Sequence, residues 1–123
     1  MNIPVTQRLE LEDGLHKGVI IDIEYRDSPY LYTDVVIEFK KIVDPHDPKL
    51  DQAMRLKAGY PTCISEASKL GRLIMRFGTR LEVGKQLDPD KLLIGKPCQF
   101  QTTTEETKKG IFARVLPDSV KPV

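Results

Sequence analysis

Residues 65–77 read Ser-Glu-Ala-Ser-Lys-Leu-Gly-Arg-Leu-Ile-Met-Arg-Phe, and they predict an amphipathic helix. Apolar side chains recur there at steps of three and four residues, which places them on one helical face. The members of this face are Ala67, Leu70, Leu73, Ile74 and Phe77. We expect Ser65 to cap the first turn, because its hydroxyl can accept a bond from an early helical amide, and the helix to end before Gly78.

Three strand-like segments precede this helix. Residues 16–25, 32–42 and 53–60 each alternate apolar and polar side chains, which is the period-two pattern of a half-buried strand. Short polar residues and a proline predict a turn at 26–29. Two prolines predict a loop at 44–48, because each fixes its own φ and keeps the residue before it out of helical space.

Two further strands follow the helix. Residues 88–95 begin with an aspartate and a proline and end with a glycine, a pattern that predicts one short helical turn. Residues 97–104 and 111–116 then alternate as strands around a polar hairpin loop at 105–110. In the last strand the alternation sets Ile111, Ala113 and Val115 inward and Phe112 and Arg114 outward.

This order predicts a mainly β protein with one α-helix: a five-stranded OB-like Greek-key barrel of order β-β-β-α-β-β. The 123 residues have room for one core, so we expect a single barrel at 15–117, an N-terminal arm at 1–14 and a flexible tail at 118–123. Barrels of this type usually hold oligonucleotides or oligosaccharides and rarely carry chemistry of their own. The predicted architecture therefore indicates binding.

Composition narrows the class further. The chain is 40% apolar and 30% charged, and no apolar run approaches the roughly 20 residues of a membrane-spanning helix. Residues 1–12 lack the basic start and apolar stretch of a signal peptide, so we expect a cytoplasmic protein that contacts no membrane. Cys63 and Cys98 stand far apart without metal-type spacing, and we expect two reduced thiols and no cofactor.

The formal net charge of +1 hides an uneven distribution. Residues 1–52 hold six Lys/Arg against eleven Asp/Glu, whereas residues 53–123 hold thirteen against seven. A bipolar molecule with a basic surface from its second half would attract polyanions. Ordinary solvated charges that happen to divide unevenly remain the alternative.

Catalytic motifs are absent from the sequence. His16 and His46 belong to no nucleophile or zinc motif, and there is no nucleophile elbow, Walker loop or dinucleotide fingerprint, so we expect no enzyme. One loop has residue types that hard cations accept, and its members are Asp44, His46, Asp47 and Asp51. Their spacing fits no EF-hand, so we predict no metal site and a plain proline-stiffened loop.

The better candidate is a surface. In an OB barrel the third strand pairs with the fifth, so outward Arg55 and Lys57 should lie beside outward Phe112 and Arg114. Such a patch offers a ring on which a base can stack and cations that meet phosphates. With the loops that frame the groove, the predicted nucleic-acid-binding residues are Tyr30, Tyr32, Lys40, Arg55, Lys57, Lys108, Lys109, Phe112 and Arg114.

Each of these residues also has a structural explanation. Phe112 could pack under the N-terminal arm, and the tyrosines could fill the barrel mouth. Lys108 and Lys109 could be a solvated hairpin tip. Asp34 and Glu38, on the outward side of the second strand, argue against a uniformly cationic groove.

Four segments can be taken together: Gly18-Val-Ile-Ile-Asp-Ile-Glu24, Ser68-Lys-Leu-Gly71, Leu93-Ile-Gly-Lys-Pro-Cys-Gln-Phe100 and Gly110-Ile-Phe-Ala-Arg-Val115. Together they resemble small OB-fold proteins of phage and prophage replication or recombination modules, and the resemblance implies binding of single-stranded DNA. From backbone charge and base stacking on the predicted surface we expect binding with little sequence preference, with RNA as the alternative ligand. We also expect a homo-oligomer, because one small barrel covers few nucleotides. The alternative function is a structural or adaptor domain in a phage-like or larger assembly.

Overall fold

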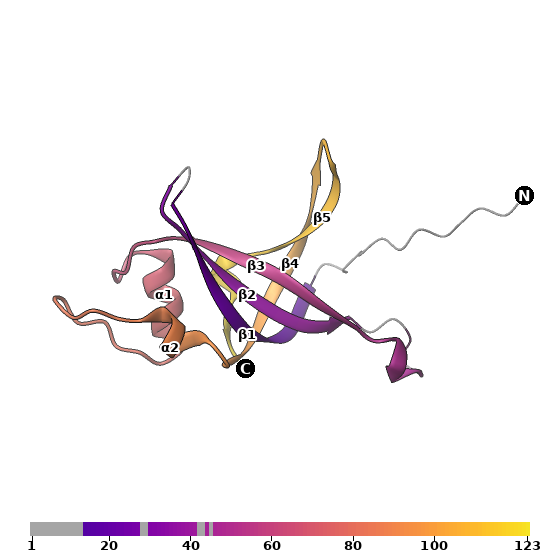
Figure 1. The fold of residues 1–123 in the computed structure, drawn as a ribbon, viewed down its shortest axis with the longest axis horizontal. Helices are drawn as coiled ribbons and strands as arrows, with labels where there is room; N and C mark the ends of the chain where they lie inside the picture. The colour runs from indigo at the N-terminus through magenta and orange to yellow at the C-terminus, as the bar shows by residue number, and fades with distance from the viewer. Residues whose placement is uncertain (1–13, 28–29, 42–43, 45) are drawn as a thin grey trace, which may run out of the picture.

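The protein is described by a computed structural model that covers residues 14–27, 30–41, 44 and 46–123. Its main feature is one antiparallel sheet (Figure 1). The strands are β1 (Gly14–Arg26), β2 (Tyr32–Lys41), β3 (Gln52–Pro61), β4 (Pro97–Thr107), β5 (Gly110–Val115) and β6 (Lys121–Pro122). The spatial order is β3-β2-β1-β4-β5, and β6 pairs with β4. The prediction of a mainly β fold is confirmed.

Strand β1 is shared between two neighbours, and this curves the sheet. Its first half pairs with β4, its second half pairs with β2, and the register shifts between Ile20 and Asp22. A shift of this kind bends a strand and increases its twist. As a result, side chains from strands that are not adjacent meet inside the curve: the Phe39 ring of β2 lies 5.4 Å from the Phe100 ring of β4, edge to face.

The concave side of the sheet carries the core. On β2 the predicted inward side chains Val35, Ile37 and Phe39 are buried, but the predicted alternation is incomplete, because Asp34 and Val36 of the opposite parity are only 5% exposed. On β3 the inward side chains Met54 and Ala58 are buried, and Arg55 and Lys57 between them are exposed, so the predicted alternation is confirmed there. Burial of Val, Ile, Phe and Met side chains stabilises the fold by about 1.5–3 kcal/mol each.

Two helices cover one end of the sheet (Figure 1): α1 (Lys69–Arg76) and α2 (Pro89–Leu93). The predicted cap of α1 is wrong by three residues, because Ser68, not Ser65, accepts the bond from the Gly71 amide at 2.9 Å. Ser65 instead forms a turn with Ser68, in which each backbone amide donates to the other's hydroxyl. The short helix α2 confirms the turn predicted for 88–95, with Asp88 as its cap.

The predicted pairing of the third and fifth strands is wrong for the described residues. β3 and β5 are the two ends of the strand order, and no ladder joins them. They still approach each other to within 8 Å between Cα atoms. Strand β5 has only six residues, and Pro117, which has no amide to donate, follows it closely. The sheet is therefore strongly curved but not closed into a barrel.

The segment predicted as a loose tail packs against the sheet. Pro117–Ser119 form a 3-10 turn, Val120 is buried and β6 adds to the edge of β4. The Arg76 guanidinium of α1 holds this segment by donating from Nε to the Val120 carbonyl at 2.8 Å. Gly14 already belongs to β1, and the rest of the predicted N-terminal arm lies outside the described residues.

Among the described residues, no helix is long and apolar enough to cross a membrane.

Candidate nucleic-acid interface

A hollow of about 670 Å³ lies between the turn that joins β1 to β2 and the hairpin that joins β4 to β5. The described ends of β1 and β2 at this turn and the β4–β5 hairpin project from the same side of the sheet (Figure 1). Their ends contribute Arg26 and Tyr32 from the first and Glu105 and Glu106 from the second. We call this space the interface hollow.

The interface hollow brings together residues from both ends of the sheet. Lys57 of β3 and Arg114 of β5 both line it, although no ladder joins their strands. The sequence predicted that these two cations share a surface, and the curvature of the sheet provides it. Both side chains are exposed, which confirms their predicted outward orientation.

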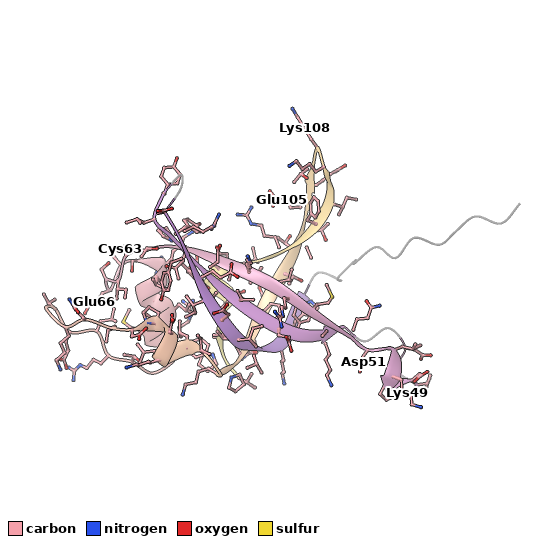
Figure 2. The ribbon with its side chains drawn as sticks, viewed as in Figure 1. Lys49, Asp51, Cys63, Glu66, Glu105 and Lys108 are labelled. Atoms are coloured by element: carbon pink, nitrogen blue, oxygen red, sulfur yellow. The ribbon has the colours of Figure 1, made fainter. Side chains whose placement is uncertain are left out.

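Tyr32 also lines the interface hollow, whereas the remaining predicted site residues lie outside its lining. Arg55 and Lys40 lie farther along the convex face, on β3 and β2, and both are exposed. Lys108 and Lys109 stand at the tip of the β4–β5 hairpin, where Figure 2 shows Lys108 beyond Glu105. Tyr30 is exposed beside the β1–β2 turn.

The three predicted aromatic residues differ in what they can offer a base. Tyr32 is half-buried and packs on the backbone of β3, since a Cβ added at Gly59 would lie 2.5 Å from its Cε1. The Arg26 guanidinium lies 5.2 Å from the centre of the Tyr32 ring. Tyr30 and Phe112 are open to solvent, and Phe112 is 51% exposed. Stacking on a base is therefore available to Tyr30 and Phe112, whereas Tyr32 is a wall of the interface hollow.

Ion pairs cover the convex face of β1, β2 and β3. Lys57 Nζ of β3 lies 2.7 Å from Glu24 Oε2 of β1, so this pair reaches across β2. Arg55 Nε lies 3.1 Å from Glu38 Oε2, its direct neighbour in the β2–β3 register. The hydrogen bond that the Lys57 ammonium donates to Glu24, together with the negative charge of Glu24, raises the pKa of Lys57.

Two more pairs lie at the sides of the interface hollow. Arg26 contacts both carboxylate oxygens of Asp34, with Nε at 2.7 Å and Nη2 at 3.0 Å. Arg114 Nη1 lies 3.0 Å from Glu105 Oε2. We call Glu24–Lys57, Glu38–Arg55, Asp34–Arg26 and Glu105–Arg114 the interface ion pairs. The groove is therefore not uniformly cationic, because the Asp34 and Glu38 carboxylates pair with the Arg26 and Arg55 guanidinium groups.

Sequence reasoning missed several residues of this region. Arg26 lies in the segment predicted as a turn and Lys69 in the predicted helix, and neither was predicted as a site residue, yet both line the interface hollow. Arg26 could have been recognised as a site residue because it stands opposite Tyr32, a predicted site residue, across a short turn. Ile111, predicted inward, is exposed because the hairpin extends beyond the helices and the core (Figure 1). Leu31 is exposed beside Tyr30. Each of the two projecting connections thus carries an exposed apolar pair.

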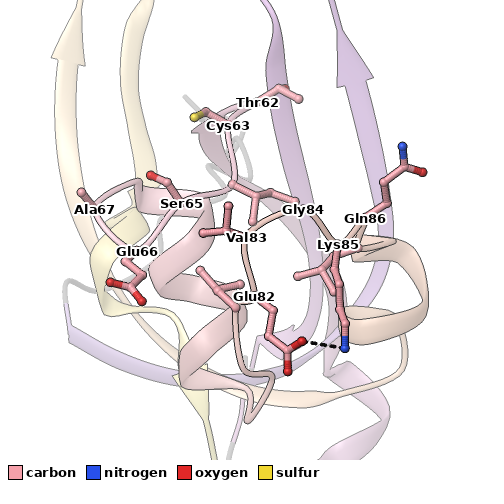
Figure 3. A pocket seen from close by; sticks show the side chains of 13 residues that line it. Thr62, Cys63, Ser65, Glu66, Ala67, Glu82, Val83, Gly84, Lys85 and Gln86 are labelled. Carbon is pink, nitrogen blue, oxygen red and sulfur yellow. Dashed lines mark ion pairs between the residues drawn. The ribbon is translucent and has the colours of Figure 1, made fainter.

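A second and larger hollow of about 930 Å³ lies at the helical end, between residues 62–67 and 81–87 (Figure 3). Its lining is largely apolar, and its one ion pair among the described residues joins Lys85 Nζ to Glu82 Oε2 at 2.6 Å. Cys63 is exposed at its rim. Cys98 is buried on β4, and burial raises the pKa of its thiol to about 11. Both cysteines are free, as predicted.

The acidic loop forms no metal cluster. Among the described residues, no group of three or more His, Cys, Asp or Glu side chains could hold a metal ion. Asp44 and Asp47 instead accept hydrogen bonds from the backbone amides of His46 and Lys49. Asp51 lies near Lys49 at the end of the sheet opposite Cys63 (Figure 2).

Comparison with known proteins adds no assignment: no family model matches this chain, and no curated protein matches it.

Proposed function

We propose that this protein binds single-stranded nucleic acid, single-stranded DNA before RNA, without catalysis and with little sequence preference. The observation that carries the proposal is the interface hollow, where Lys57 and Arg114 meet from strands at opposite ends of the sheet. Exposed Tyr30 and Phe112 stand on the two connections that flank it. Cations that meet phosphates and rings that stack on bases are what an unpaired strand needs.

The strand order supports an OB-like interpretation of the fold. β3-β2-β1-β4-β5, with β3 and β5 close together and α1 between β3 and β4 in the chain, is the order of an OB barrel whose last seam is open. In such barrels the ligand crosses the sheet between the first and the fourth loops, and these are the two connections that flank the interface hollow. A role in phage-type replication or recombination remains part of this proposal.

Fluorescence anisotropy with a labelled oligo-dT tests the proposal directly. Affinity should fall as salt rises, because neutralised phosphates release condensed counterions, and the single strand should bind more tightly than a duplex of equal length. Replacing Phe112 by Ala should weaken binding by about 5- to 150-fold, since stacking contributes about 1–3 kcal/mol per base. The melting temperature of the Phe112→Ala variant should change little, because the Phe112 ring is half exposed.

Arg114→Ala and Arg80→Ala form a matched pair for the charge contribution. Both arginines are exposed, but Arg80 follows α1 at the helical end and does not line the interface hollow. Arg114→Ala should weaken binding and flatten the salt dependence by about 0.7 in log–log slope, whereas Arg80→Ala should do neither. Equal effects of both changes would point to net charge alone and contradict the proposed site.

The second candidate is an adaptor domain in a larger assembly. The exposed apolar pairs Tyr30–Leu31 and Ile111–Phe112 favour it, because side chains of this kind also anchor protein interfaces. Analytical ultracentrifugation separates the two functions. A concentration-dependent oligomer that dissociates when Ile111 is replaced by Ser, without any affinity for oligo-dT, would establish the adaptor and reject nucleic-acid binding.

A further inference from the structure

The interface ion pairs occupy the cations that a phosphate backbone would otherwise meet. Arg26, Arg55, Lys57 and Arg114 each have a carboxylate within 3.1 Å. A phosphate that approaches Lys57 must therefore displace Glu24 or bind next to its negative charge. Lys108 and Lys109, by contrast, contact no carboxylate among the described residues, but they lie at the hairpin tip outside the interface hollow.

The exposure of these carboxylates distinguishes two roles. The Asp34 side chain is only 7% exposed, and it receives two bonds from Arg26, so it is part of the folded framework. The side chains of Glu24 and Glu38 are 45% and 40% exposed. Surface ion pairs of this kind contribute only about 0–1 kcal/mol to stability. Folding alone therefore does not require Glu24 and Glu38.

We infer that Glu24 and Glu38 act as internal competitors of phosphate, which makes the interface hollow and the convex face beside it selective for strands with accessible bases over polyanions in general. This inference rests on the proposed function. A polyanion without bases gains little from cations that are already neutralised. A single strand with bases also gains stacking on Tyr30 and Phe112, and this gain does not depend on displacing a carboxylate.

The sheet register makes the competition geometrically specific. Glu38 stands directly opposite Arg55, and Glu24 reaches Lys57 across β2. Both carboxylates thus lie on the same convex surface as the cations, on strands that come from the acidic half of the sequence. Glu82 provides a matched control, because it also forms one exposed ion pair, with Lys85, but beside the other hollow (Figure 3).

The experiment compares two labelled strands of about 15 nucleotides, oligo-dT and an abasic strand of the same length, at two or more salt concentrations. Wild-type protein should bind oligo-dT at least about tenfold more tightly than the abasic strand. The double variant E24Q/E38Q should bind the abasic strand about tenfold more tightly than wild type does, or about threefold per carboxylate removed. It should also steepen the salt dependence by about 1.4 in log–log slope, because two more phosphates are neutralised.

The control variant E82Q removes the same formal charge per residue and should leave both affinities within about twofold of wild type. Thermal melts followed by circular dichroism verify that the variants are folded. Equal wild-type affinity for the two strands, or an unchanged E24Q/E38Q variant while wild type binds oligo-dT, would overturn the inference and leave the proposed function standing. No binding of oligo-dT by wild type or by the double variant would overturn both.

Discussion

Replacement of Val120 by Ala should destabilise the protein strongly, although this residue is the fourth from the C-terminus. Val120 is 0% exposed and belongs to the core cluster. The change removes two buried methyl groups, worth about 0.8 kcal/mol each, and leaves a cavity that adds to the loss. We expect a loss of about 2–3 kcal/mol in the free energy of unfolding. In a domain of this size that corresponds to a fall of about 6–15 °C in melting temperature.

Val123→Ala is the matched control, because it makes the same substitution three residues later, at a side chain that is 64% exposed. We expect its free energy of unfolding to stay within about 0.5 kcal/mol of wild type. Thermal and urea unfolding followed by circular dichroism measure both variants. If the free energies of unfolding of Val120→Ala and Val123→Ala are equally close to that of wild type, the C-terminal segment is not docked and the prediction of a loose tail is right.

Three further predictions concern thiols, a close contact and a buried hydroxyl. One thiol, that of Cys63, should react quickly with Ellman's reagent in native protein and the second only after unfolding. The reason is that Cys98 is buried with a pKa of about 11, so only about one molecule in a thousand carries its thiolate at pH 8. Gly71→Ala should lower the free energy of unfolding by about 1–3 kcal/mol in urea titrations, because the new Cβ would overlap the Ser65 carbonyl. An unchanged free energy of unfolding would contradict the described start of α1. Tyr60→Phe should lower the free energy of unfolding by about 1 kcal/mol in the same assay, because the buried Tyr60 hydroxyl donates to the Pro117 carbonyl at 2.6 Å. An unchanged free energy of unfolding would mean that this hydrogen bond is absent.

The positions of the strands and helices could be predicted because each depends on a local pattern. Alternation in β3 reflects burial of one face, and the structure buries Met54 and Ala58 of that face; on β2 it buries Val35, Ile37 and Phe39 as predicted but also Val36 of the opposite face. The start of α1 was harder, because two serines in one turn could each cap it. Ser68 is the cap because Ser65 folds back onto it, with its carbonyl accepting from the Ser68 hydroxyl at 3.0 Å. Single-residue propensities cannot distinguish two such arrangements.

The long-range features could not be predicted from local patterns. Pairing of the third and fifth strands was inferred from an expected barrel, but β5 is too short to extend along the ten residues of β3. Docking of the C-terminus depends on one buried valine and on Arg76 of a distant helix. Nothing near Val120 in the sequence signals that this arginine will hold its carbonyl.

The distribution of charge along the sequence does not predict the distribution of charge on the surface of the candidate site. The first 52 residues are acidic and the rest are basic, which predicted separate acidic and basic surfaces. The antiparallel order instead places β3, from the basic half, beside β2 and within reach of β1, both from the acidic half. Glu38 and Glu24 therefore meet Arg55 and Lys57, and the two halves neutralise each other on one face. A balanced face of this kind weakens attraction to phosphate alone, so under the proposed function affinity for a strand must come largely from its bases.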